Sequence, residues 1–147
     1  MADSDDLTTY ATNIPEAVWP LVKRFWPGPL TLVLPRSSAV SDMITGGRDT
    51  VAIRIPDHPV PQAIVRQLGG PVTGTSANRS GGPEATTAEG VRREFGSRVD
   101  MVMDSPEPAP GQASTVLDIS TGSLRVLRLG AVSRREIEET CGEPVAV

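Results

Sequence analysis

The sequence predicts an α/β fold in which a twisted sheet, mixed but largely antiparallel, is flanked by helices within a single domain over residues 1–147. Short apolar runs of strand length alternate along the chain with helical three-to-four patterns, which is typical of an α/β sheet. The last two runs, within residues 114–129, are separated only by a turn at Thr121 and Gly122. That spacing predicts an antiparallel hairpin and therefore a mixed sheet. At 147 residues, the chain is long enough for one hydrophobic core.

Helices are expected where apolar side chains recur every three to four residues and where a capping pattern precedes them. Residues 15–25 show the recurrence, but Pro20 interrupts it and predicts a short helix or a late start. Thr86 with Glu89, and Ser133 with Glu136, have the spacing of a capping box. The expected helices lie within residues 15–25, 57–68, 86–95 and 133–141.

The strands are expected between these helices, at residues 30–34, 50–55, 72–75, 101–103, 114–118 and 124–129. The first follows Trp26–Pro29, where two prolines and a glycine exclude both regular states and predict a turn. Residues 37–48 and 105–112 are polar or proline-rich and are expected to be surface loops.

Composition excludes several classes of protein. The chain has no apolar run of membrane-spanning length, and Met1–Asp6 is acidic, unlike the start of a secretory signal. A single cysteine, Cys141, cannot form an internal disulfide, which is consistent with a cytoplasmic location. The net charge of −4 gives no general attraction to nucleic acid or anionic lipid.

The chain's one histidine also limits its chemistry. With only His58 and Cys141 available, side chains are not expected to bind a metal, and a Ser-His-Asp triad would need His58 as its base. Because His58 lies between Asp57 and Pro59, just before an expected helix, a role at the helix cap is the preferred interpretation.

Arg54 is the first candidate binding residue. On a strand, Thr50, Ala52 and Arg54 share one face, opposite Ile53 and Ile55. A guanidinium within a sheet needs an anion such as a carboxylate, because its charge is otherwise costly to desolvate. An edge strand whose polar face meets water explains the same pattern, so both interpretations stay open at this point.

Three further segments place polar residues beside strands. Gly74–Gly82 could bring backbone N–H groups close to a phosphate, but it lacks the Walker A pattern, and an ordinary turn explains it as well. Ser114 begins a strand after a loop, and Arg125 and Arg128 precede Gly130. Either arginine could hold a phosphate or could simply be solvated.

The order of these segments is more specific than any one of them. The chain resembles the YrdC-like family of L-threonylcarbamoyladenylate synthases in five motifs, which are Phe25–Thr31, Val51–Pro59, Thr75–Gly81, Ala113–Asp118 and Arg128–Gly130. The resemblance covers residues 7–139 and implies the YrdC-like form of the α/β fold.

The resemblance also implies a reaction, in which L-threonine, bicarbonate and ATP form threonylcarbamoyl-AMP and pyrophosphate for threonylcarbamoyladenosine formation in tRNA. It leaves the catalytic residues unassigned. The residues it assigns to threonine are Arg54, Ser114 and Thr75, of which Thr75 could face either ligand. Those it assigns to ATP are Thr50, Ser76, Asn78, Glu84 and Arg128. Mg²⁺ would be bound to the phosphates of ATP. The partners would include tRNA or tRNA-modification proteins.

The sequence departs from the family at its start. Members open with a Thr-rich Tyr-Gly turn, a Lys-x-Arg motif and a strand that ends in histidine, and no segment here matches them. The departure predicts weaker ATP binding and impaired catalysis, and an unpaired sheet edge that favours a homo-oligomer.

Two alternative functions are open at this stage. One is a nucleotide- or RNA-binding module without catalysis, although the net charge of −4 does not favour RNA. The other is a carbamoyl-transfer domain of the hydrogenase-maturation type. The presence of Arg54 and Ser114 favours threonine over that second alternative.

Overall fold

The computed structural model describes residues 1–79, 81–82, 85–104 and 112–146, and it contains two compact units. One unit consists of Met1–Val72 and Gln112–Val147, and the other of Thr73–Gly111. The elements of the first unit are α1 (Leu7–Tyr10), α2 (Val18–Phe25), β1 (Leu30–Pro35), α3 (Asp42–Thr45), β2 (Thr50–Ile53), α4 (Pro59–Leu68), β3 (Thr115–Asp118), β4 (Leu124–Arg128), α6 (Arg134–Cys141) and β5 (Val145–Ala146). Those of the second unit are α5 (Ala88–Phe95) and the 3₁₀ helix Gly96–Arg98.

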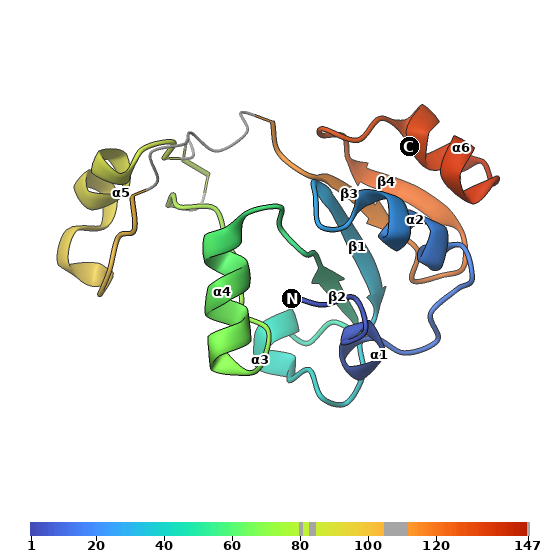
Figure 1. Cartoon of the computed structure of the whole chain (residues 1–147), viewed down its shortest axis with the longest axis horizontal. Coiled ribbons are helices and arrows are strands. Elements are labelled where there is room, and N and C mark those ends of the chain that lie inside the picture. Colours follow the sequence, from blue (N-terminus) through green and yellow to red (C-terminus); the bar gives the residue numbers. More distant parts are fainter. Residues whose placement is uncertain (80, 83–84, 105–111, 147) are drawn as a thin grey trace. The chain divides into compact units, whose positions relative to one another are not determined.

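The first unit contains a five-stranded sheet in the order β2-β1-β3-β4-β5 (Figure 1). β1 pairs antiparallel with β2 and parallel with β3, and β3 and β4 form the antiparallel hairpin expected from the sequence. β4 then pairs parallel with β5. The mixed α/β sheet predicted from the sequence is therefore confirmed.

The core lies on one face of this sheet. Along β1, Leu30, Leu32 and Leu34 are fully buried, whereas Thr31 and Val33 between them are half-buried on the other face. α2 and α6 lie next to each other against the sheet (Figure 1) and contribute Leu21 and Ile137, among others, to the same apolar cluster. Alternation along the strands thus separates a packed face from a face that carries polar side chains.

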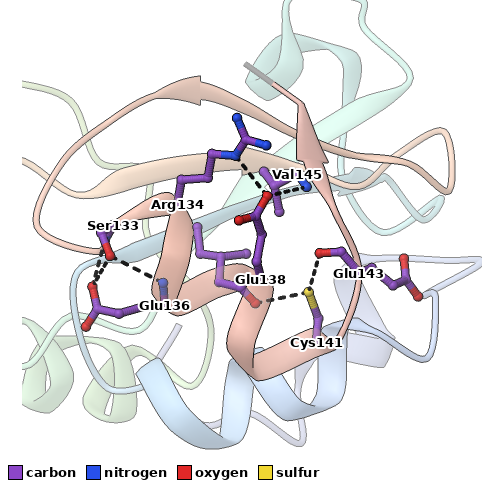
Figure 2. Close-up of polar contacts among 8 residues, drawn as sticks. Ser133, Arg134, Glu136, Glu138, Cys141, Glu143 and Val145 are labelled. Carbon is purple, nitrogen blue, oxygen red and sulfur yellow. Dashed lines mark hydrogen bonds and ion pairs between the residues drawn. The ribbon is translucent and has the colours of Figure 1, made fainter.

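α6 begins at the predicted capping box. The Ser133 Oγ accepts a hydrogen bond from the Glu136 backbone N–H at 3.3 Å, and the Glu136 carboxylate accepts one from the Ser133 N–H at 2.9 Å (Figure 2). One turn later, Glu138 accepts from Arg134 at 2.9 Å and from the Val145 N–H at 3.0 Å. The Glu138 carboxylate thereby links the helix to the start of β5.

Most of the expected elements of the first unit are confirmed. The helix within residues 15–25 starts late, at Val18, and the strands at 30–34, 114–118 and 124–129 form with small changes at their ends. β2 ends at Ile53, so that Arg54 follows the strand instead of lying within it. α1 and β5 were not expected from the sequence, and α3 forms inside the loop predicted at 37–48.

Two predicted strands are wrong. Residues 72–75 and 101–103 form no strand, and Met101 is 76% exposed. A run of three or four residues becomes a strand only when another strand pairs with it, and neither run has such a partner among the described residues. The predicted N-terminal cap of α5 is also wrong by one residue. The capping side chain is that of Thr87, not Thr86, and it accepts a hydrogen bond from the Gly90 N–H at 3.0 Å. The loop predicted at 105–112 lies outside the described residues except for Gln112.

In the described part of the chain, no helix combines the length and the apolar character needed to cross a membrane.

Candidate functional site

The ends of four strands meet at one edge of the sheet. Because β1 and β3 are parallel, both begin at this edge, and their antiparallel neighbours β2 and β4 both end there. Four polar residues consequently come together, which we call the arginine rim: Thr31 in β1, Arg54 after β2, Ser114 before β3 and Arg128 at the end of β4. The topology thus gathers residues that are far apart in the sequence.

Ser114 is at the centre of the hydrogen bonds of the arginine rim. Arg128 donates to the Ser114 carbonyl from Nε at 3.2 Å and from Nη2 at 2.9 Å, and from Nη2 also to the Ser114 Oγ at 3.1 Å. The same Oγ lies 2.9 Å from the Oγ1 of Thr31. Ser114 is only 6% exposed, so these contacts hold its hydroxyl in a nearly water-free position.

Arg54 supplies a second positive charge at this edge. Its side chain reaches solvent, yet partial burial and, second, the nearby charge of Arg128 lower the pKa of its guanidinium. In the residues that the structure describes, neither arginine forms an ion pair with a carboxylate. Two adjacent guanidinium groups without an acidic partner are suited to hold a carboxylate or a phosphate.

The turn Trp26–Pro29 holds the strand ends together. The Gly28 N–H donates to the Ile55 carbonyl at 2.9 Å, and the Thr115 N–H donates to the Pro29 carbonyl at 2.9 Å. Gly28 has no room for a side chain, because a Cβ atom there would lie 2.3 Å from the Phe25 carbonyl oxygen. The turn therefore ties the segment after β2 and the start of β3 to the beginning of β1.

Thr115 and Gly130 support the arginine rim from the covered side. The buried Thr115 hydroxyl accepts from the N–H groups of Gly130 at 2.9 Å and Val132 at 3.1 Å, and it donates to the Val132 carbonyl at 2.5 Å. A Cβ atom on Gly130 would lie 2.2 Å from the Ala113 carbonyl oxygen. The chain after Arg128 is therefore pressed against the chain before Ser114.

Neither Thr31 nor Thr115 was assigned to a ligand from the sequence, although Thr115 stands beside Ser114 at the start of a predicted strand. Thr31 is the one polar residue in an otherwise apolar strand, Leu30–Leu34, and that interruption was the available signal. Thr115 gave no separate signal, because a threonine is common in strands.

Thr50 lies away from the arginine rim. It begins β2, opposite Pro35, whereas Arg54 follows the other end of that strand. At the rise of a strand, four residues separate the two positions by about 13 Å. Thr50 and Arg54 therefore mark two different ends of β2.

The predicted loop residues Thr75, Ser76 and Asn78 belong to the second unit. There, the Asn78 amide donates to the carbonyl of Gly82 at 2.8 Å, and the Asn78 N–H donates to the Ser76 carbonyl at 3.0 Å, which folds the segment into a tight turn. The Thr75 hydroxyl donates to the Ser76 carbonyl at 3.1 Å. Glu84 lies outside the described residues.

His58 caps a helix, as expected. Its Nδ1 accepts a hydrogen bond from the Val60 N–H at 3.2 Å at the start of α4. Within the described residues, no three His, Cys, Asp or Glu side chains gather closely enough to hold a metal ion.

Comparison with known proteins identifies the relatives of this chain. A family model for Sua5/YciO/YrdC proteins, described as telomere recombination, matches residues 1–130. A protein of Pyrococcus abyssi named threonylcarbamoyl-AMP synthase is 41% identical over 143 residues, which are 97% of this chain and 42% of that protein. A Bacillus subtilis protein of the same name is 40% identical over 97% of this chain and 41% of its own length.

A solved structure shares the fold. The crystal structure of P. abyssi Sua5 complexed with L-threonine matches with a TM-score of 0.92 and 40% identity, over 99% of this chain and 43% of that one. The chain therefore spans about two fifths of the length of these relatives.

Proposed function

Because the chain belongs to the Sua5/YciO/YrdC family, we propose that it is a protein of the threonylcarbamoyl-AMP synthase type that binds L-threonine at the arginine rim. The reaction joins L-threonine, bicarbonate and ATP into threonylcarbamoyl-AMP and releases pyrophosphate, for the modification of tRNA. The proposal rests on relatives of that name and on the threonine complex of one of them.

The arginine rim is the observation that carries the proposal. Its two guanidinium groups have no carboxylate partner in the described residues, and Arg54 has a lowered pKa that a bound anion would raise again. The planar Arg54 group can hold the threonine carboxylate through two parallel hydrogen bonds. Ser114, at the same end of the sheet, offers a buried hydroxyl to the same ligand.

The chemistry requires the protein to position anions. The amine of threonine adds to carbon dioxide, supplied by bicarbonate, and loses a proton to give a carbamate. An oxygen of this carbamate then attacks the α-phosphorus of ATP, and the bond to the β-phosphate oxygen breaks, releasing pyrophosphate. Fixed positive charge near the reacting groups favours this step, because every reactant is an anion or becomes one.

The nucleotide side of the proposal rests on the family resemblance. Arg128 is the candidate at the arginine rim, and the further nucleotide candidates are Thr50, Ser76, Asn78 and Glu84. Mg²⁺ would enter as part of the MgATP substrate. Thr75 is the third candidate for threonine.

Pyrophosphate release tests the proposed reaction. The chain is incubated with MgATP, bicarbonate and L-threonine, and each substrate is omitted in turn. Release that requires all three is the expected result. Pyrophosphate formed equally without threonine, or no pyrophosphate from the complete mixture, would contradict the proposed function.

A further inference from the structure

The direction in which the Ser114 hydroxyl proton points depends on its hydrogen bonds with Arg128 and Thr31. Arg128 has only donors, so the Ser114 Oγ must accept the bond from its Nη2 at 3.1 Å. A serine hydroxyl has two acceptor positions and one proton. The contact with Thr31 at 2.9 Å therefore either uses that proton or fills the second acceptor position.

We propose that Thr31 is a positioning residue that donates its hydroxyl proton to Ser114 and so turns the Ser114 proton toward the ligand. With Arg128 and Thr31 both donating, both acceptor positions of the Ser114 Oγ are filled. Ser114 can then act toward the ligand only as a hydrogen-bond donor. A carboxylate, which has only acceptors, fits this arrangement.

The position of Thr31 in the fold supports this role. It lies in β1, where it pairs with Val116 of β3, and the next residue, Leu32, pairs with Ile53 of β2. Its branched side chain has few rotamers on a strand. Arg54 directly follows Ile53, the β2 residue that pairs with Leu32, so Thr31 and Arg54 lie at the same end of the sheet. The proposal rests on the proposed function, since it takes the carboxylate to be that of threonine.

The first experiment compares two substitutions at this position. Thr31→Val keeps the branched shape and removes the hydroxyl, whereas Thr31→Ser keeps the hydroxyl. Titration calorimetry with L-threonine is expected to give an affinity about three- to tenfold weaker for Thr31→Val, which corresponds to one neutral hydrogen bond, and within about twofold of wild type for Thr31→Ser. The matched control is Thr140→Val, whose half-buried hydroxyl donates to the Glu136 carbonyl of α6, away from the arginine rim.

A double-mutant cycle with Ser114→Ala shows whether Thr31 acts through Ser114. If it does, Thr31→Val weakens threonine binding in the wild-type background but changes it less than about twofold when Ser114 is already alanine. Equal losses in both backgrounds, or wild-type affinity in Thr31→Val, would overturn the proposal. A loss that Thr31→Ser fails to restore, with a lower melting temperature in both variants, would also overturn it in favour of a packing role.

The outcome for Thr31 is separable from the outcome for the reaction. A chain that binds threonine in the expected Thr31 pattern but releases no threonine-dependent pyrophosphate supports the positioning role and contradicts the proposed synthase activity. Normal turnover together with unchanged threonine affinity in Thr31→Val supports the synthase activity and overturns the positioning role. Failure of the wild-type chain to bind L-threonine overturns the positioning role as well.

Discussion

α6 and the arginine rim differ in whether their charged side chains have partners of opposite charge. On α6, Arg134 pairs with Glu138 at 2.9 Å, and Glu136 closes the capping box (Figure 2). Arg135 also pairs with Glu139 at 2.7 Å. At the arginine rim, Arg54 and Arg128 have each other's charge nearby and no carboxylate in the described residues.

The difference separates charges that are paired within the chain from charges that the proposed function assigns to a ligand. Hydrogen bonds from Ser133 lower the pKa of Glu136, and hydrogen bonds from Val145 and Arg134 lower that of Glu138. Each of these carboxylates is stabilised within the chain. The pKa of Arg54 is lowered instead, first by its partial burial and second by the nearby charge of Arg128.

The largest effect is expected from separating the two segments that form the arginine rim. Gly130→Ala would place a Cβ atom 2.2 Å from the Ala113 carbonyl oxygen, and rigid backbone on both sides prevents an easy adjustment. We expect the free energy of unfolding to fall by about 3 kcal/mol or more, measured by chemical denaturation. Gly74→Ala is the control, since a Cβ atom there meets nothing within 4 Å. Equal stability of the two variants would show that the close contact at Gly130 is unimportant.

Removing the buried hydroxyl below Ser114 is expected to have the next largest effect. Thr115→Val leaves the N–H groups of Gly130 and Val132 without the acceptor that they share. A loss of about 2–3 kcal/mol in the free energy of unfolding follows from leaving buried donors unpaired. Thr115→Ser, which keeps the hydroxyl, should recover most of this loss in the same denaturation experiment. If the serine variant is no more stable than the valine variant, the hydrogen bonds do not explain the effect.

Arg54→Lys tests the ligand side of the comparison directly. A lysine keeps the charge but cannot form two parallel hydrogen bonds to a carboxylate, so the affinity for L-threonine should fall about 10- to 100-fold. ATP affinity and melting temperature should stay close to wild type, because Arg54 forms no ion pair within the described residues. The matched control is Arg125→Lys, at an exposed position of β4. A lower melting temperature together with weaker binding of both ligands would make Arg54 a structural residue.

Acid titration is expected to show the smallest effect, and only on the α6 side. Because the pKa values of Glu136 and Glu138 are lowered in the folded chain, their contribution is present above their unfolded pKa of about 4.5. It is lost as the pH falls through the lower folded values. Thermal melts at decreasing pH should show this loss, and Glu138→Gln should reduce it. A Glu138→Gln variant whose stability has the same pH dependence as that of wild type would contradict the role of the Glu138 carboxylate in this loss.

The elements that local chemistry determines were predictable from the sequence. The capping box at Ser133, the cap of α4 at His58 and the turn at Trp26–Pro29 all depend on neighbouring residues, and all formed as expected. The order of the five motifs was likewise sufficient to identify the family that the comparisons confirm.

Strand pairing and the site were decided by the tertiary structure. Residues 72–75 and 101–103 had strand-like composition, but a strand also needs a partner, and composition does not specify one. The same holds for Thr31 and Ser114, which are 83 residues apart in the sequence and become neighbours only because β1 and β3 pair in parallel. A single sequence contains the residue types of a site, whereas the register between distant strands determines which of their side chains meet.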